Sequence, residues 1–422
     1  VGVHRQLLSD PEDDLRSKGI PEIRAATLTR LVQAMCNPIQ GTLKFRRVFM
    51  LTYRTFGTPL EVLEELLNCY NVTSAGGLTE ICSAAVKTIL DWMRDYYTID
   101  WEAEDALVQR LKLFLDELDQ NGTAENKANK QILCDEWESV QSNVRQKQLQ
   151  WERVRGKFAE WLRLETSDMN FDNFPANEIA DTLTSYSFAY YSNLNHREYL
   201  AWLKGSDAKK EEHKNLDILV DLFNRVSSWT STELVTKLKL KERVAAVTKM
   251  LAIAERLYET NNFLCLKALI TGVFGSSVRR MQRTFEQVPS DVLNRLDEID
   301  RKLSLTKNFK DYRSLMDTIC PPCIPYLGMY QKDILFINDG NPDSYAHLIN
   351  FAKRSRIAEP IFDLSFCQIG SFHLNSSLCN PAFLSYLLNT PLLSDKELHL
   401  YSRRADPRDP EMVIAELVQS ES

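Results

Sequence analysis

The sequence lacks several features that would assign it to a broad class at once. It has no apolar run approaching about 18 residues, so it predicts no transmembrane segment. Its formal net charge of −7 over 422 residues is not the basic excess expected of a nucleic-acid binder. The opening residues VGVHRQLLSDPEDD have neither the basic start nor the apolar middle of a secretory signal. We therefore expect a cytoplasmic protein, or one whose natural N-terminus lies upstream.

The motifs of bond-making enzymes are missing as well. There is no G-x-S-x-G, H-E-x-x-H or G-x-x-x-x-G-K-[ST] pattern, and no convincing pair of carboxylates on a shared face. The six histidines are dispersed, and each is interpreted as a surface or packing residue. These absences argue against an ordinary enzyme and predict neither a cofactor nor a metal.

The nine cysteines are an odd number and are scattered along the chain. Cys320 and Cys323 have the spacing of a metal or redox pair, but no second pair accompanies them. We predict a structural role for these two, with zinc or disulfide chemistry as the alternative. Four others fall in helical apolar patterns and are interpreted as reduced core thiols: Cys69, Cys82, Cys134 and Cys265.

What the chain does contain is helical periodicity. Forty-four per cent apolar residues and seven tryptophans indicate a globular protein, long enough for two or three domains. Strand-like alternation is scarce, with residues 366–375 as the main exception. The sequence therefore predicts an all-α fold. Its clearest apolar stripes are Val244, Val247, Leu251, Ala254 and Tyr258, and Val292, Leu293, Leu296, Ile299 and Leu303.

Several helix boundaries can be predicted. Ile23 to Val32 has helical spacing, Thr58-Pro59 is typical of a helix start, and Ser394 to Glu397 forms a capping box that opens the last helix. Residues 125–169 contain few helix breakers, which predicts two long helices or one bent helix. We interpret this stretch as a connecting arm packed on both domains. An amphipathic regulatory or membrane-touching segment is the alternative, although its charges are mixed in sign.

Residues 320–357 are the stretch around which the chain is organised. Three prolines stop whatever precedes, and Leu327, Tyr330, Ile334 and Ile337 then follow at helical spacing. Leu335 and Phe336 lie off this stripe. The turn formers of residues 338–342 end the first helix. The stretch is therefore predicted to form a helical hairpin with one carboxylate near its tip. The second helix of this hairpin carries its own apolar stripe: Tyr345, Leu348, Ile349, Ala352 and Ile357.

This hairpin resembles that of the catalytic domain of guanine nucleotide exchange factors for Ras-type small GTPases. The resemblance rests on PPC.P.LG.Y..D..FI..GNPD....LINF.KR and on further blocks in the family's order: residues 174–200, 224–229, 242–263, 283–289 and 401–407. The block LTYRTFGTP, followed by VKTILDWMRDYYTIDW, resembles the Ras exchanger motif, a helical module that precedes the catalytic domain and supports its hairpin. The resemblance, together with the composition of the segments outside its blocks, predicts this division of the chain: tail 1–18, Ras exchanger motif 19–125, connecting arm 126–172, exchange domain 173–410 and tail 411–422.

The resemblance implies catalysis without bond chemistry. A bulky apolar residue at the hairpin tip excludes Mg²⁺, and a carboxylate near the α-phosphate site repels phosphate; these roles fall to Leu335 and Asp339. The family more often has Glu where Asp339 stands, so the charge is kept with a shorter reach. Two plainer alternatives remain: Leu335 is a core leucine, and Asp339 only caps the turn.

Counting within each block carries the rest of the GTPase footprint onto this chain. Lys267 departs from the apolar residue expected there, through a shifted register, a different GTPase preference or a lysine stem lying across the pocket. Trp229, Glu242 and Arg243 are expected to have buried structural roles. The predicted GTPase-binding residues are Val220, Asn224, Lys267, Phe274, Arg279, Phe309, Tyr326, Lys332, Phe336 and Arg356.

The expected partner is a Ras-like small GTPase of Ras or Rap type, bound most tightly in its nucleotide-free form. Membrane recruitment would come through the GTPase or through other domains. Two alternatives stay open: a hydrolase, which would turn over substrate without any GTPase, and a helical module that binds the GTPase without exchanging its nucleotide.

Overall fold

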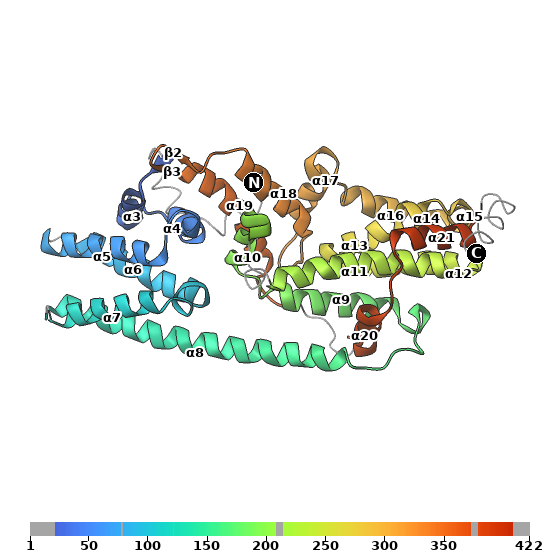
Figure 1. The fold of residues 1–422 in the computed structure, drawn as a ribbon, viewed down its shortest axis with the longest axis horizontal. Coiled ribbons are helices and arrows are strands. Elements are labelled where there is room, and N and C mark those ends of the chain that lie inside the picture. The colour runs from blue at the N-terminus through green and yellow to red at the C-terminus, as the bar shows by residue number, and fades with distance from the viewer. Residues whose placement is uncertain (1–21, 77–78, 121, 208–213, 373–378, 408–422) are drawn as a thin grey trace. The chain divides into compact units, whose positions relative to one another are not determined.

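The computed structural model describes residues 22–76, 79–120, 122–207, 214–372 and 379–407 (Figure 1). Within these ranges the regular structure is almost entirely helical, and the strands are only two or three residues long. The predicted all-α fold is therefore confirmed. No helix in this part of the chain combines the length and apolarity needed to cross a membrane. The predicted tails, residues 1–18 and 411–422, lie outside the described residues.

The chain forms two compact units, each assembled from separate stretches of sequence. Unit 1 consists of residues 1–153, 200–207 and 331–363, and unit 2 of residues 154–199, 208–330 and 364–422. Unit 1 thus combines the N-terminal helices with most of the stretch predicted to form the hairpin.

The N-terminal helices of unit 1 bury apolar side chains along their inner faces. Thr58 and Glu61 cap the start of α5, because the Thr58 N–H donates to Glu61 Oε2 at 2.8 Å and the Glu61 N–H donates to Thr58 Oγ1 at 3.3 Å. Val62 and Leu66 on α5 are buried. The elements are β1 Ala25–Ala26, α3 Leu28–Cys36, α4 Leu43–Thr52, η1 Tyr53–Thr55, α5 Pro59–Gly76, α6 Thr79–Tyr96, the π-helical η2 Tyr97–Trp101 and α7 Asp105–Gln120.

A buried carboxylate holds this group of helices together. Asp100 is fully buried, and it accepts hydrogen bonds from the Tyr53 hydroxyl and the Trp92 indole, both at 2.6 Å. Arg54 adds an ion pair to the same carboxylate. Tyr53 and Arg54 belong to the LTYRTFGTP block, so that block meets the second block of the module at one buried charge.

The connecting arm is a single helix, α8 Ala124–Trp161, of 38 residues (Figure 1). In unit 1, Trp137 contacts the rings of Tyr97 and Trp101, with centroids 5.4 and 5.7 Å apart. The last turns of the helix belong to unit 2, where Phe158 contacts the Tyr186 ring at 5.0 Å. Of the two predicted forms, one helix is therefore present rather than two.

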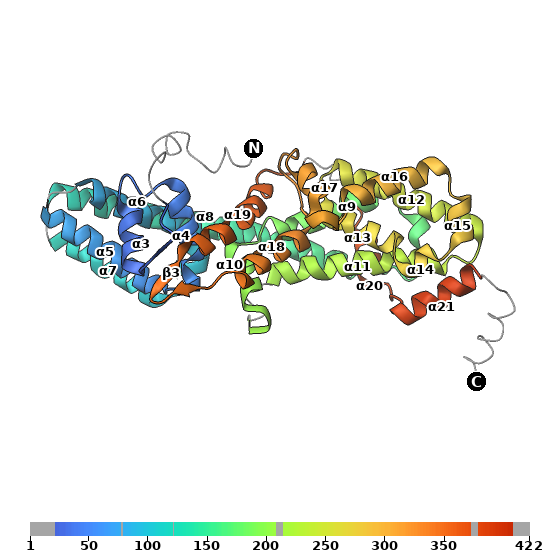
Figure 2. The same cartoon turned by 90° about the horizontal axis from the view of Figure 1, so that it is seen from above.

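Unit 2 is built on long helices that lie side by side, among them α11, α12 and α13 (Figure 2). Gly272 permits the close approach of α13 to α11, because a Cβ there would lie 2.5 Å from the Ser227 carbonyl oxygen. The elements after α8 and before α18 are η3 Phe171–Asn173, α9 Ala176–Tyr191, α10 His196–Ala201, η4 Trp202–Asp207, α11 Lys214–Thr236, α12 Leu240–Glu259, α13 Phe263–Val273, α14 Ser276–Arg279, α15 Gln282–Gln287, α16 Ser290–Lys302 and α17 Thr306–Met316.

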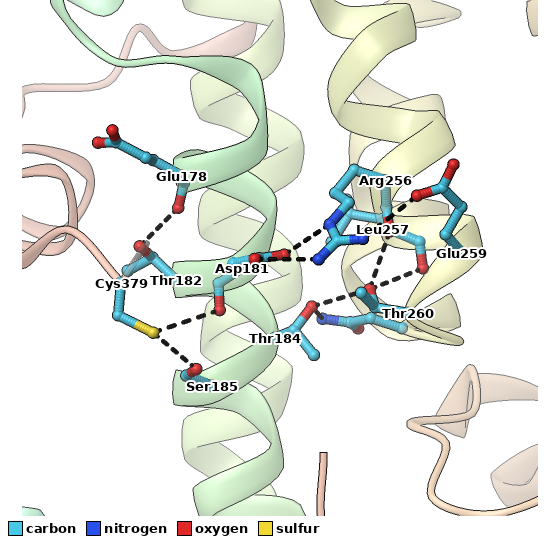
Figure 3. Close-up of polar contacts among 11 residues, drawn as sticks. Glu178, Asp181, Thr182, Thr184, Ser185, Arg256, Leu257, Glu259, Thr260 and Cys379 are labelled. Atoms are coloured by element: carbon cyan, nitrogen blue, oxygen red, sulfur yellow. Dashed lines mark hydrogen bonds and ion pairs between the residues drawn. The ribbon is translucent and has the colours of Figure 1, made fainter. Parts of the chain in front are cut away.

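Polar contacts join α9 to α12 (Figure 3). Asp181 is fully buried and receives two hydrogen bonds from Arg256, at 2.8 and 3.1 Å. One turn further along α9, the Thr184 hydroxyl lies 3.2 Å from that of Thr260, and both are buried. Because a buried carboxylate without a partner is costly, these bonds also fix the register between the two helices.

The last elements of the chain are α18 Leu327–Asp339, β2 Ser344–Tyr345, β3 Leu348–Asn350, α19 Phe351–Cys367, α20 Pro381–Asn389 and α21 Asp395–Ala405. The predicted capping box at the start of α21 is confirmed: the Ser394 N–H donates to Glu397 Oε2 at 2.7 Å. All nine cysteines lie in the described ranges as free thiols. Cys82 and Cys265 are buried, as predicted for core thiols, while Cys69 and Cys134 are half-buried.

Three predictions of secondary structure are wrong. The second helix of the hairpin was predicted to include Tyr345, Leu348 and Ile349, but these residues lie in β2 and β3, and α19 begins at Phe351. The helix predicted from Ile23 begins at Leu28, because Ala25 and Ala26 pair with β3 in a sheet of order β1-β3-β2. The third is the strand-like stretch of residues 366–375, of which residues 366–367 are the end of α19. Residues 373–375 of this stretch lie outside the described residues.

Candidate functional site

The end of α18 exposes one face that carries four of the predicted site residues. Ile334 is fully buried, whereas Phe336 is 78% exposed, Leu335 is half-buried, and Lys332 and Asp339 are exposed. Residues three and four apart share a helix face, so Lys332, Leu335, Phe336 and Asp339 lie together opposite Ile334. We call these four residues the tip face. It offers a water-exposed aromatic ring beside a carboxylate and an amine.

Leu335 and Asp339 therefore do not match their plainer alternatives in full. Leu335 is only half-buried, so it is not a fully buried core residue. The Asp339 carboxylate receives a contact from the amide of its neighbour Asn338 at 3.4 Å, while the cap on the Ile337 carbonyl is supplied by the Asn341 amide at 2.8 Å. The Asp339 carboxylate remains exposed to solvent.

The predicted Arg356 lies on α19. Its Nη1 donates to the Asn341 side-chain oxygen at 3.3 Å, so it contacts the turn that follows α18. The Asn350 side chain accepts from the Lys353 N–H at 3.1 Å and so caps the start of α19. Arg356 and the tip face are thus parts of the same unit, separated by a turn with fixed ends.

Unit 1 joins this region to the N-terminal helices. Ala25 pairs with Asn350 across β1 and β3, and the Ala352 N–H donates to the Arg24 carbonyl at 3.0 Å. Next to this pairing, the Phe45 and Phe351 rings lie 4.8 Å apart. The start of α19 is therefore packed on the N-terminal helices through backbone bonds and an aromatic contact.

Unit 2 contributes an aromatic group around Tyr326. Its ring lies 6.3 Å from that of Phe309 and 5.6 Å from that of Phe223. Burial raises the pKa of Tyr326. Gly328 makes room for the ring, because a Cβ at residue 328 would lie 2.4 Å from the Tyr326 hydroxyl oxygen. The predicted pair Tyr326 and Phe309 is thus brought together.

Phe309 ends a run of three residues with left-handed backbone. Lys307, Asn308 and Phe309 have φ values of 50°, 56° and 59°. Non-glycine residues adopt this conformation rarely and at some cost in free energy, so such strain often occurs at functional positions. Phe309 itself is only 4% exposed, which makes it a wall of the aromatic group rather than an open surface.

The predicted residues on α11 and α13 lie in different surroundings. Val220, 43% exposed, and Asn224 are four residues apart on one exposed face of α11. The guanidinium carbon of Arg279 lies over the Phe274 ring, 4.5 Å from the centre of that ring. Lys267 is 9% exposed, and its amine lies 3.5 Å from Asp300 on α16.

Buried structural roles were predicted for Trp229, Glu242 and Arg243, and two of the three are buried. Trp229 and Arg243 are buried, as expected, and Arg243 donates to Thr284 Oγ1 at 2.8 Å. Glu242 is exposed and pairs with Lys239 at 3.0 Å, so the expectation of a buried role for it is wrong. Glu242 stands in the first turn of α12, where a carboxylate is favoured by the helix dipole without burial.

Phe223 and Asp343 were not among the predicted site residues. Phe223 stands directly before Asn224 and would have been found by asking which aromatic on α11 can reach Tyr326. Asp343 ends the GNPD block, and it pairs with two basic residues of α19. No pattern in the sequence indicated its partners.

Comparison with known proteins finds two family domains in this chain. The family model of the RasGEF domain matches residues 178–355, and that of the RasGEF N-terminal motif matches residues 22–114. Among curated proteins of Dictyostelium discoideum, Ras guanine nucleotide exchange factor J is 28% identical over 93% of this chain and 49% of its own length. Factor W is 30% identical over 83% of this chain and 32% of its own length.

The chain therefore spans about half or less of the length of these relatives. Factor E is 37% identical over a shorter segment, 42% of this chain and 18% of its own length. Both family models match in the order predicted from the sequence blocks. The chain accordingly carries a RasGEF N-terminal motif followed by a RasGEF domain, and it is similar over most of its length to Ras guanine nucleotide exchange factors.

Proposed function

We propose that this chain accelerates GDP release from a Ras-like small GTPase of Ras or Rap type, so that GTP can bind in its place. The observation that carries the proposal is the tip face. A large apolar residue and a carboxylate lie one turn apart there, on the exposed side of a helix end. Large apolar side chains are normally buried in a protein that has no partner, and Phe336 is 78% exposed.

The mechanism needs no bond to be made or broken. A small GTPase holds GDP through backbone donors, a lysine and Mg²⁺. Leu335 would occupy the space that the metal and the switch side chains need, and Asp339 would repel phosphate while accepting hydrogen bonds from the phosphate-binding loop. The exchange factor then binds the nucleotide-free GTPase more tightly than the loaded form, and linkage weakens nucleotide binding by the same factor.

Each unit would supply its own contacts to the GTPase. In unit 1 these are the tip face and Arg356. In unit 2 the aromatic group of Tyr326 and Phe309, with Val220 and Asn224 on α11, would receive an apolar side chain of the GTPase. Phe274, Arg279 and Lys267 complete the proposed contact residues, and we add Phe223 because its ring contacts Tyr326.

The double substitution Leu335→Ala with Asp339→Ala tests this mechanism. We expect the rate of fluorescent-GDP release from purified Ras and Rap to fall roughly 10- to 100-fold, the range of coupling free energies of about 1–3 kcal/mol. Circular dichroism and the melting temperature should stay close to those of the wild-type chain, since neither side chain is fully buried.

The matched control is Leu113→Ala with Asp116→Ala, an exposed leucine and an exposed aspartate on α7. This variant should exchange at the wild-type rate. Wild-type release by the tip-face variant would remove Leu335 and Asp339 from the mechanism. A wild-type chain that binds the GTPase but leaves the GDP off-rate unchanged would instead support the alternative, a GTPase-binding module without exchange activity.

A further inference from the structure

The turn after α18 carries a charge cluster that the proposed mechanism does not use. Asp343 Oδ1 lies 2.9 Å from Lys353 Nζ and 2.7 Å from Arg354 Nη2, both near the start of α19. The two cations are 3% and 2% exposed, whereas the Asp343 side chain is 70% exposed. Asp343 is the one acidic partner that either cation has within the part of the chain that the structure describes.

This arrangement differs from an ordinary surface ion pair. Exposed pairs contribute little to stability, because water screens both charges. Lysine and arginine are almost never fully buried unless they are paired, and here one carboxylate compensates both. The hydrogen bond from Lys353, together with the charge of Arg354, holds the pKa of Asp343 below its usual range. The carboxylate therefore stays ionised at neutral pH.

Further bonds fix the same turn, residues 340–343. The Asn350 amide donates to the Pro342 carbonyl at 2.8 Å, and the Asn350 N–H donates to the Asp343 carbonyl at 3.0 Å. At the other end, the Asn341 amide caps the Ile337 carbonyl of α18 at 2.8 Å. The turn is thus tied to the last turn of α18 on one side and to the start of α19 on the other.

We propose that Asp343 is a positioning residue: its pairing with Lys353 and Arg354 fixes the turn and so holds the tip face in one orientation relative to the start of α19. The inference rests on the proposed exchange activity of the tip face. Arg354 also lies 5.9 Å from the centre of the Phe56 ring, so the cluster connects the turn with the N-terminal helices. A tip face that is already ordered meets the GTPase without first losing conformational freedom.

The test compares Asp343→Asn and Asp343→Glu with the wild-type chain in GDP release from Ras at increasing Ras concentration. We expect Asp343→Asn to lower the maximal rate roughly 10- to 100-fold, as for a misplaced reacting group, with little change in KM. Asp343→Glu keeps the charge and should restore most of the rate. The control Glu359→Gln removes an exposed pair with Lys44 on the same unit and should exchange like the wild type.

A second variant separates positioning from stability. Asp343→Asn combined with Lys353→Met and Arg354→Met removes all three charges, and apolar replacement of buried ionic groups often restores stability. If Asp343 acts by positioning, this variant melts close to the wild type and still exchanges slowly. Recovery of the wild-type rate in this variant would overturn the inference, as would a wild-type maximal rate for Asp343→Asn.

Amide hydrogen exchange of residues 340–350 in the free protein gives a readout that needs no GTPase. In the Asp343→Asn variant, the amide hydrogens of these residues should exchange with solvent faster than in the wild type. Equal amide exchange rates in the two proteins would contradict the proposed fixing of the turn. If the wild-type chain releases no GDP while this difference is present, the proposed function fails and the fixing of the turn by Asp343 stands.

Discussion

At the scale of single residues, Gly328 is a position in the candidate site where an added methyl group would overlap with a neighbouring side chain. Its Cβ would lie 2.4 Å from the Tyr326 hydroxyl oxygen and 2.6 Å from the ring carbon that carries it. Gly328→Ala should therefore displace the ring and raise KM for the GTPase several-fold in GDP-release assays, a loss of about 1 kcal/mol or more.

The matched control is Gly156→Ala on α8, where a Cβ meets nothing within 4 Å. Alanine suits a helix interior better than glycine, so this variant should be more stable by roughly 0.5–1 kcal/mol and exchange normally. A Gly328→Ala variant with wild-type KM would show that the Tyr326 ring is not part of the GTPase contact.

His196 makes stability depend on pH. Its Nε2 lies 3.2 Å from the Ser365 hydroxyl, and burial lowers the pKa of His196 to about 4. Below pH 6.5, the ordinary pKa of histidine, His196 is protonated in the unfolded chain but stays neutral in the folded chain. The free energy of unfolding is therefore highest above pH 6.5 and decreases as the pH drops toward 4. By pH 5 the loss should reach about 2 kcal/mol.

Urea unfolding at pH 7.5 and pH 5 measures this loss. His196→Gln should remove about that much of the difference in free energy of unfolding between the two pH values. His347→Gln, at an exposed histidine, should leave the difference unchanged. An identical pH dependence in both variants would mean that another group is responsible.

At the scale of elements, the sequence predicted best where the signal is local. The start of α5 at Thr58-Pro59 and the capping box of α21 depend on residues within one turn, and the structure has both. The apolar stripes of α12 and α16 are also buried in large part, with Val247, Leu251 and Leu296 in the core. Helical periodicity is set by the neighbours in the chain, so one sequence suffices to find it.

The short sheet could not be predicted in this way. Tyr345, Leu348 and Ile349 have spacings of three and one, which suit a helix as well as a strand. Tyr345 pairs with Leu348 next to the turn, whereas β3 also pairs with Ala25 and Ala26, which are more than 300 residues away. The two-residue turn between β2 and β3 contains Ala346 with φ 53°, where hairpin turns usually have Gly or Asn. No local signal therefore marked the turn.

The candidate site was only partly predictable for a related reason. The period of the buried stripe of α18 placed Leu335 and Phe336 off the core side, and the resemblance to the exchange-factor hairpin indicated Leu335 and Asp339 as site residues. The surroundings of Lys267 depend on Asp300, which lies on a different helix. The left-handed backbone of residues 307–309, and the ring contact of Phe223, are likewise products of tertiary packing.

At the scale of the whole molecule, the N-terminal helices are expected to support the tip face. A chain reduced to residues 170–422 loses β1, Phe45 and Phe56, all of which contact residues 349–354. We expect its GDP-release rate to fall roughly tenfold or more, because α19 loses backbone and aromatic partners. A chain of residues 22–422 is the control and should keep the full rate.

Phe45→Ala tests the same support without a truncation. It removes the ring that contacts Phe351 at 4.8 Å and should slow release while the melting temperature falls by a few degrees. Full activity of residues 170–422, together with full activity of Phe45→Ala, would contradict a supporting role for the N-terminal helices.

The pairing of β1 with β3 also bears on how the protein is made. Residues 25–26 leave the ribosome long before residues 349–350, and unit 1 needs both to close. Most of unit 2 lies in the sequence between these two segments. The first helices of unit 1 therefore lack β3 while most of the chain is synthesised. The edge of β1 and the Phe45 ring therefore lack their native contacts until residues 349–351 have been synthesised.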